Sequence, residues 1–286
     1  MRRRMVSGLI ALFVAALVGM PAAAITYGEP DGNAHPYVGL VVFYDSSGAP
    51  THRCTGTLLS STVFLTAGHC TDGTASAQVW FDERVTAAIG YPTSGGVTGA
   101  TYTHPSFNFS ALPATYDVGV VVLDKPVKMT TYGALPSLGV LDRLATKRGT
   151  QSVSFTVVGY GLQEVKPTYM ADRSRLRGTV QLVNLRSALT DGYNLQATNA
   201  PGTGGGTCFG DSGGPVFIEN TKTIAGVNSF VLNSNCKLEL QGRRLRLPDG
   251  PGHQPGLRQP VPVTGPAPRS FERGRRQYAP PPFRTL

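Results

Sequence analysis

Between residue 25 and about residue 230, short apolar runs alternate with turn signals along the sequence. Each run has the length of a β-strand, and some alternate apolar with polar residues, as at positions 179–183. Glycine, asparagine and aspartate separate the runs, as at positions 31–33 and 94–96. Because no long amphipathic helix interrupts this pattern, we expect an all-β fold of antiparallel strands, in two barrels joined by a linker around residues 124–136.

The two ends of the chain differ from this central part. Arginines at positions 2–4, an apolar run over 8–20 and alanines at 22–24 predict that residues 1–24 are a signal peptide removed on export. An uncleaved membrane anchor is the alternative. Residues 237–286 hold ten prolines and nine arginines, a composition typical of disordered chain. The expected folded part is therefore residues 25–236.

The positive charge of the chain lies in these two ends. The formal net charge is +9, of which residues 1–24 carry +3 and residues 237–286 carry +7, so that residues 25–236 carry −1. A nearly neutral folded part gives no indication of specific nucleic-acid binding. Non-specific binding of the arginine-rich tail to an anionic surface is a separate alternative.

The sequence contains four cysteines, Cys54, Cys70, Cys208 and Cys236. An even number of cysteines in an exported protein indicates disulfides. Four cysteines allow three pairings, of which we favour the local pairs 54–70 and 208–236. Neither a Cys-x-x-Cys motif nor a Cys/His spacing typical of zinc is present, and no metal or organic cofactor is predicted.

Three segments carry residues suited to nucleophilic catalysis. His69 lies in the sequence TAGHC at residues 66–70, and Asp117 precedes an apolar strand at residues 118–123. Taken alone, neither the His69 segment nor the Asp117 segment is strong evidence for catalysis. Ser212 lies in the sequence CFGDSGGP at residues 208–215, and the glycines on both sides of it permit a sharp turn and a close approach of substrate. Amide N–H groups in such a turn can converge on an oxyanion.

The GDSGGP sequence at residues 210–215 is identical to the nucleophile motif of the chymotrypsin-like (trypsin) serine peptidases. The histidine and aspartate segments resemble the two other motifs of that family, with Gly68 where alanine is commoner, and the order His, Asp, Ser is the family's own. The resemblance covers about residues 25–236. It implies two chymotrypsin-like barrels with the active site in the cleft between them, and a secreted, monomeric endopeptidase that acts on proteins or peptides.

The resemblance also implies a role for each catalytic residue. Ser212 would be the nucleophile, His69 the general base, and Asp117 the group that orients the histidine. The amide groups of Gly210 and Ser212 would form the oxyanion hole. The disulfide Cys54–Cys70 would hold the loop that carries the histidine, and Cys208–Cys236 would hold the specificity pocket.

The resemblance assigns a role to the first residue after the predicted signal peptide. Family members become active when a new Ile or Val amino group folds inward and pairs with the aspartate that precedes the nucleophile, which is Asp211 here. Cleavage after Ala24 leaves Ile25 as the new terminus. We therefore hypothesise that removal of the signal peptide itself creates the activating amine. The alternative is that Ile25 is only the first residue of a strand.

Four residues correspond to the family's substrate pocket. Gly206 stands at the pocket floor, where trypsin-like members carry aspartate, so a preference for Arg or Lys is not expected. Ser229 and Phe230 correspond to the segment that pairs with substrate backbone, and Val231 to the pocket mouth. A branched side chain there favours small or medium apolar residues before the scissile bond, unless a shifted loop points Val231 elsewhere.

The C-terminal segment departs from the family. After the cysteine that matches Cys236, members continue with a pocket-wall strand and a helix, and residues 237–286 resemble neither. A solvated tail is one interpretation, and a frameshifted end of the gene is another. If both elements are missing, the second barrel is incomplete. The alternative function is then a secreted, protease-like protein without activity.

Overall fold

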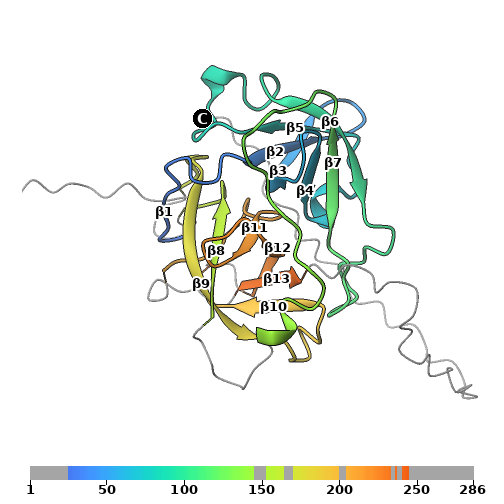
Figure 1. Ribbon diagram of the computed structural model, residues 1–286. Helices are drawn as coiled ribbons and strands as arrows, with labels where there is room; N and C mark the ends of the chain where they lie inside the picture. The colour runs from blue at the N-terminus through green and yellow to red at the C-terminus, as the bar shows by residue number, and fades with distance from the viewer. Residues whose placement is uncertain are drawn as a thin grey trace, which may run out of the picture.

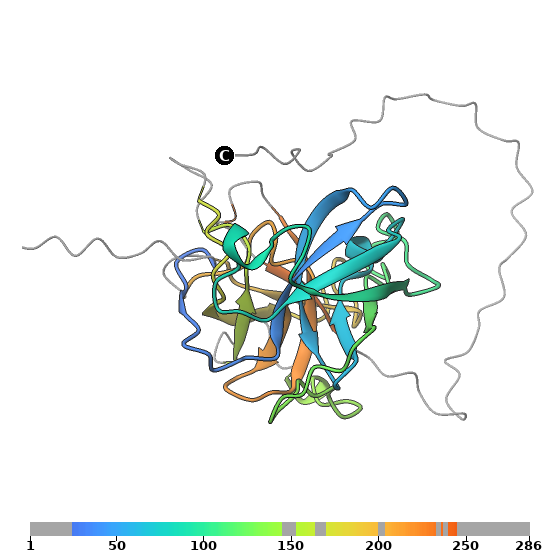
Figure 2. The same cartoon turned by 90° about the horizontal axis from the view of Figure 1, so that it is seen from above.

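The computed structural model describes residues 25–144, 153–163, 170–199, 204–232, 236 and 240–244. The predicted signal peptide over residues 1–24 and the end of the predicted tail, residues 245–286, lie outside these ranges. Within them the chain is built from strands, and none of its helices has the length and apolar character that a bilayer-crossing helix needs. Figure 1 shows two bodies of strands, one above the other, and Figure 2 looks down on them from above.

Six strands of the first half close into a barrel, in the order β2-β3-β4-β7-β6-β5. All neighbouring strands in it are antiparallel. The strands are β2 (Val38–Tyr44), β3 (Pro50–Leu58), β4 (Val63–Thr66), β5 (Ser76–Trp80), β6 (Val97–Thr103) and β7 (Gly119–Leu123).

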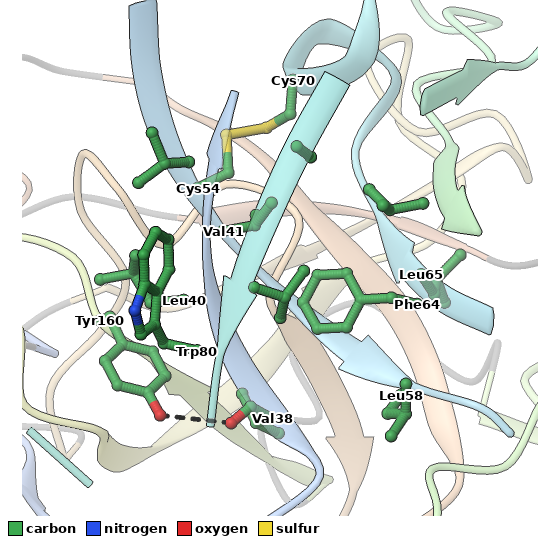
Figure 3. Close-up of a cluster of buried hydrophobic side chains, with 14 of the residues drawn as sticks. Val38, Leu40, Val41, Cys54, Leu58, Phe64, Leu65, Cys70, Trp80 and Tyr160 are labelled. Carbon is green, nitrogen blue, oxygen red and sulfur yellow. Dashed lines mark hydrogen bonds between the residues drawn. A yellow bond between two sulfur atoms is a disulfide. The ribbon is translucent and has the colours of Figure 1, made fainter. Parts of the chain in front are cut away.

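The first barrel closes around a core that contains the only tryptophan of the sequence, Trp80. Every residue of β2 is buried, so neither side of this strand faces solvent. Its sequence is accordingly a nearly continuous apolar run, without alternating polar residues. Figure 3 shows Leu40, Phe64 and Trp80 converging inside the barrel. Tyr160, from the second half of the chain, donates its hydroxyl to the Val38 carbonyl at 3.3 Å and so ties the two barrels together.

The second half forms a sheet in the order β9-β10-β13-β12-β11-β8, and a further pairing of β8 with β9 joins its two ends into a ring. A short strand, β1 (Glu29–Pro30), adds to the outside of β9. The ring strands are β8 (Ser154–Gly159), β9 (Leu176–Asn184), β10 (Asn194–Ala197), β11 (Pro215–Ile218), β12 (Ile224–Val231) and β13 (Leu240–Arg244). The expectation of an all-β, two-barrel fold is confirmed.

Strand β13 corrects the prediction that no strand follows Cys236. Leu240–Arg244 pairs with β10 on one side and with β12 on the other. The prediction failed because composition averages over the whole segment 237–286, whereas five residues are enough to fill a gap between two strands that offer unpaired backbone groups. The predicted folded part therefore extends beyond residue 236 to at least residue 244.

The helical elements of the described chain are short: α1 (Gly68–Thr71), η1 (Ala87–Ile89) and η2 (Asp142–Leu144). Strand β7 ends at Leu123 and β8 begins at Ser154, so the linker predicted around residues 124–136 lies between the two barrels. It is held to the first barrel by backbone hydrogen bonds, such as Gly133 N–H to the Leu58 carbonyl at 3.0 Å.

A buried ion pair fixes the N-terminal segment to the start of β9. The side chains of Arg175 and Asp31 are fully buried, and Arg175 Nε donates to Asp31 Oδ2 at 3.0 Å. His35 Nδ1 lies 2.5 Å from the other carboxylate oxygen. Burial alone would raise the pKa of Asp31, but the hydrogen bonds and charge of His35 and the charge of Arg175 hold it below its ordinary value. The remaining Arg175 N–H groups bond to the carbonyls of Val38 and Phe81, to Tyr160 Oη and to Asn33 Oδ1.

Candidate active site

The three motif segments occupy turns and short helices at the ends of strands. His69 lies in α1, which follows β4, and Asp117 lies two residues before β7. Ser212 lies in the turn before β11. At Gly68, where alanine was expected, a Cβ would lie 2.9 Å from the Phe107 ring and 3.0 Å from the Val118 nitrogen. The unusual glycine therefore makes room for Phe107 beside the histidine.

Asp117 holds His69 through two hydrogen bonds. His69 Nδ1 lies 2.8 Å from Asp117 Oδ2, and the His69 backbone N–H donates to Oδ1 at 2.7 Å. The Ser229 hydroxyl donates to the same Oδ2. Asp117 is 0% exposed, whereas 26% of the His69 side chain is exposed. The histidine thus presents its second ring nitrogen while its first is fixed by a buried carboxylate.

These contacts keep the Asp117 carboxylate ionised. Burial alone would raise the pKa of Asp117, but hydrogen bonds from His69 and Ser229 together with the charge of His69 hold it below its ordinary value. An ionised carboxylate on Nδ1 favours the tautomer with the proton there, so the lone pair that can accept a proton is on Nε2, which lies 3.6 Å from Cys70 Sγ.

The turn that carries Ser212 is clamped to the first barrel by Thr55 of β3. The Thr55 N–H donates to the Ser212 carbonyl at 2.8 Å, and its hydroxyl donates to the Gly210 carbonyl at 2.9 Å. The same hydroxyl accepts the Tyr160 N–H at 3.1 Å. Gly210 has φ 95°, in the region that glycine adopts without strain. Thr55, from the first barrel, therefore connects the turn that carries Ser212 to the backbone at Tyr160.

A second glycine of this turn packs against the residues that precede the histidine. A Cβ on Gly213 would lie 2.0 Å from Thr66 Oγ1 and 2.8 Å from the Ala67 nitrogen. Ser212 is half-buried, and within the described chain no hydrogen bond joins its hydroxyl to His69. Such contacts are often long in the absence of substrate. The structure therefore brings the segments of His69 and Ser212 together, but the two side chains do not form a hydrogen bond.

Asp211, next to Ser212, is fully buried inside the second barrel. Its oxygens accept N–H groups from Gly161 at 2.7 Å and from Cys208 at 2.9 Å. Burial raises the pKa of Asp211 to about 7, although these two hydrogen bonds and the charge of Arg53 partly oppose the shift. The burial of this carboxyl therefore outweighs the contacts that favour its charged form.

Comparison with known proteins agrees with this arrangement. The sequence model of the trypsin family, described as Trypsin, matches residues 27–241, which is most of the chain. The chain belongs to the trypsin family. Chymotrypsin-like elastase family member 1 of the dog, Canis lupus familiaris, is 26% identical over 208 residues, covering 68% of this chain and 76% of that protein. A trypsin of Saccharopolyspora erythraea is 29% identical over 212 residues, covering 71% and 85%.

Solved structures share the fold of this trypsin-family chain. HL collagenase superposes with a TM-score of 0.59 at 22% identity, over 77% of this chain and 93% of that one. An inactivated protease paralogue of the scabies mite superposes with a TM-score of 0.55 at 19% identity, over 77% and 92%. At these identities the likeness concerns the fold alone.

Both disulfides that we favoured from the sequence are present in this family member. Cys54–Cys70 joins β3 to α1, directly beside His69, and Cys208–Cys236 joins the nucleophile segment to the chain after β12. The sulfurs of Cys54 and Cys70 also lie near a His69 ring nitrogen. Because both sulfurs are used in the disulfide, this group offers no thiolate to a metal.

The start of the predicted mature chain is inserted into the second barrel. Ile25 is 0% exposed and packs in the second-barrel core. Thr26 and Gly206 exchange both backbone hydrogen bonds, at 2.9 and 3.1 Å. The first strand, β1, begins only at Glu29, so Ile25 is not part of it.

The four predicted pocket residues each have different neighbours. The Ser229 hydroxyl donates to Asp117, as described above. Val231 is half-buried and packs against the Cys208–Cys236 disulfide. Phe230 is half-buried, and its ring lies 6.2 Å from that of Phe109. Gly206 is buried, at the bridge to the N-terminal segment.

Sequence reasoning missed Phe109 and Thr55. Half of Phe109 is exposed, and its ring lies 5.8 Å from that of His69 in an edge-to-face arrangement. It comes from the long loop between β6 and β7, whose path no local pattern predicts. Thr55 is an ordinary strand residue in the sequence, and only the packing of β3 against the nucleophile turn reveals its contacts.

Proposed function

We propose that this chain is a secreted serine endopeptidase that hydrolyses peptide bonds through Ser212, His69 and Asp117. The observation that carries the proposal is the fixed pair of His69 and buried, ionised Asp117, on which the Ser229 hydroxyl also converges. Family membership makes proteolysis the expected chemistry. Protein or peptide substrates, action as a monomer and export to the extracellular space belong to the same proposal.

In this mechanism Ser212 Oγ attacks the carbonyl carbon of the scissile bond. His69 Nε2 takes the hydroxyl proton and delivers it to the leaving amine as the C–N bond breaks, which leaves an acyl-enzyme ester. A water molecule then attacks the ester, His69 takes its proton, and Ser212 Oγ recovers that proton. Asp117 keeps the imidazole in one tautomer and stabilises its charged form.

The backbone of the nucleophile turn supports an oxyanion hole. Among the described residues, the N–H groups of Gly210 and Ser212 donate to no protein acceptor. Two free N–H groups in one glycine-rich turn are available to the negative oxygen of the tetrahedral intermediate. The Thr55 hydroxyl holds the Gly210 carbonyl and so fixes the Gly210–Asp211 peptide, which lies between the two peptides that carry these N–H groups.

The N-terminal residue completes the active form. Ile25 is buried, and Thr26 pairs with Gly206, five residues before Asp211. Asp211 is a fully buried carboxyl, and an Ile25 amine released on removal of residues 1–24 would supply a cation to pair with it. N-terminal sequencing of the secreted protein should begin at Ile25, and any other start would contradict this step.

The alternative is an inactive, protease-like protein, expected if both the last strand and the C-terminal helix of the family are missing. Strand β13 pairs with β10 and β12, which speaks against a missing strand. Residues 245–286, where the helix would follow, lie outside the described residues.

Labelling with a fluorophosphonate probe tests the proposal. Such a probe reacts with a serine only when the base and the oxyanion hole are assembled around it. We expect the secreted protein to be labelled, and the Ser212→Ala variant, as the matched control, to remain unlabelled. Soluble secreted protein that takes up no label would contradict the endopeptidase proposal.

A further inference from the structure

The start of helix α1, which carries His69, is weakly defined by its own sequence. The helix has four residues, its first residue is Gly68, and the side chain of its N-cap residue Ala67 makes no capping hydrogen bond. Glycine loses more conformational freedom than other residues when it is fixed in a helix. The peptide that joins Gly68 to His69 therefore depends on contacts from outside the helix for its position.

The ring of Phe107 supplies such a contact. A Cβ on Gly68 would lie 2.9 Å from Phe107 Cδ2 and 3.2 Å from Asp117 Oδ1. The half-buried ring and the buried carboxylate oxygen therefore border the same narrow space in front of the Gly68 Cα. Because a side chain at residue 68 would enter that space, the close approach of the ring depends on the glycine.

The carboxylate that borders this space binds the residue after Gly68. Asp117 Oδ1 accepts the His69 backbone N–H at 2.7 Å, and Oδ2 lies 2.8 Å from Nδ1 of the same histidine. A shift of Gly68 would move the His69 N–H away from Oδ1 and would turn the imidazole. Packing of the Phe107 ring against Gly68 thus acts on the orientation of the histidine.

Other contacts hold the far side of the helix. The Gly68 carbonyl accepts the Asp72 N–H at 2.9 Å, and the disulfide Cys54–Cys70 fixes the residue after the histidine. These contacts restrain the carbonyl side of Gly68 and the end of α1. The Cα side of Gly68 faces the ring of Phe107.

The loop between β6 and β7 places Phe107. The Phe107 N–H donates to the His104 carbonyl at 2.8 Å, which forms a turn. The His104 N–H donates to the Val118 carbonyl at 3.0 Å, and the Asn108 N–H donates to the Thr115 carbonyl at 2.9 Å. These two bonds join the outgoing and returning arms of the loop on either side of Phe107, so the ring is fixed relative to the start of β7.

A ring in this position also excludes water from the carboxylate. Asp117 is fully buried, although the histidine that it binds is partly exposed. A water molecule in front of Gly68 would compete with the His69 N–H for Asp117 Oδ1. Hydrogen bonds are electrostatically stronger where water is excluded, so the ring strengthens the bonds that orient His69.

We propose that Phe107 is a positioning residue of the active site, which holds His69 against Asp117 through Gly68 and keeps water from Asp117 Oδ1. The inference rests on the proposed function for the roles of His69 and Asp117. It separates two phenylalanines of one loop: Phe109 lies half-exposed beside the imidazole ring, whereas Phe107 packs on the residue before the histidine.

The proton between His69 Nδ1 and Asp117 reports on this shielding without requiring catalysis. NMR of the full secreted chain with isotope-labelled histidine observes it. A second pair is an internal standard, because Asp31 likewise binds both Nδ1 and the backbone N–H of His35. In Phe107→Ala the His69 proton should exchange with water at least about tenfold faster, while the His35 proton is unchanged. An unchanged His69 proton in this variant would overturn the proposal.

Steady-state kinetics on a peptide substrate separate positioning from substrate binding. Phe107→Ala should lower kcat by about tenfold or more and change KM by less than about threefold, because a small misplacement of a catalytic group is costly. Phe107→Tyr, which keeps the ring, should stay near the parent in kcat and in proton exchange. Tyr102→Ala, which removes an exposed ring of β6, is the control and should change neither. A loss that appears in KM alone, or that is equal in Phe107→Tyr, contradicts the positioning role.

Gly68→Ala tests the contact from its other side. In the parent the added methyl group meets the ring, so kcat should fall. In the Phe107→Ala background the same group enters the space left by the ring, so kcat should rise; such coupling is expected of residues in contact. An equal effect in both backgrounds would refute the contact. Phe107→Leu, which keeps more of the apolar volume, replaces Phe107→Ala if the latter is not secreted.

Fluorophosphonate labelling of the unsubstituted protein separates the two proposals. Labelled protein whose Phe107→Ala variant keeps the parent proton exchange and kcat refutes only the positioning role. Unlabelled protein in which Phe107→Ala still accelerates exchange of the His69 proton refutes the endopeptidase and leaves the shielding of Asp117 standing.

Discussion

Replacing Arg175 by methionine should destabilise the protein strongly, because the change leaves the buried Asp31 carboxylate without its guanidinium partner. Both side chains of the Arg175–Asp31 pair are fully buried, and the guanidinium also bonds to Tyr160 Oη and to main-chain carbonyls of the first barrel. Methionine keeps much of the volume and removes the charge and all five hydrogen bonds. Removing one partner of a buried pair costs about 3–5 kcal/mol.

Urea unfolding followed by the fluorescence of Trp80 measures this loss, with the disulfides intact. At a slope of about 1–3 kcal/mol per molar urea, the midpoint should fall by at least about 1 M. The double variant Asp31→Leu, Arg175→Met removes both charges and should recover much of the loss, since a buried pair replaced by apolar groups is often neutral. A single variant within about 1 kcal/mol of the parent, or a double variant destabilised by the sum of both single changes, would refute the reasoning.

The pH dependence gives an independent check. The pKa of Asp31 is lowered in the folded protein, so the stability that it contributes is present above its ordinary pKa of 3.8 and is lost as the pH falls through the folded value. The difference between the parent and Arg175→Met should therefore be full at pH 7 and shrink below about pH 4. A difference that does not change between these values would show that Asp31 is not the charge left behind.

Three further predictions concern catalysis. Asp117→Asn should lower kcat/KM by about 10³–10⁴-fold, since the amide favours the wrong tautomer of His69; steady-state assays on a peptide substrate measure this, and a loss under tenfold would contradict the role of Asp117. Thr55→Val should lower kcat by about tenfold or more, because the carbonyl of Gly210 loses its anchor. Thr55→Ser, the matched control, should stay near the parent, and equal losses in both variants would point to packing instead. Activity should also fall as the pH rises above about 8, the ordinary pKa of an α-amino group. If the Ile25 amine pairs with Asp211 as proposed, deprotonation of the amine removes the cation of the pair; a pH–rate profile that stays flat to pH 11 would argue against this pair.

The sequence alone determined the fold class, the family and the catalytic candidates. Alternating apolar runs predict strands because the strand period is a local property, readable without knowing the neighbours. The nucleophile motif is equally local, since the turn at Ser212 needs glycine on both sides. The disulfides Cys54–Cys70 and Cys208–Cys236 could be favoured because both join cysteines close in the chain.

Other features depended on contacts between distant segments, which no local pattern specifies. The Thr55 clamp, the Phe109 ring beside His69 and the burial of the Asp31–Arg175 pair each join residues that are at least forty positions apart. Strand β13 forms because β10 and β12 leave a gap of the right width, although its own composition predicts a tail. Strand register and barrel closure decide which side chains meet, and these are properties of the whole chain rather than of any segment.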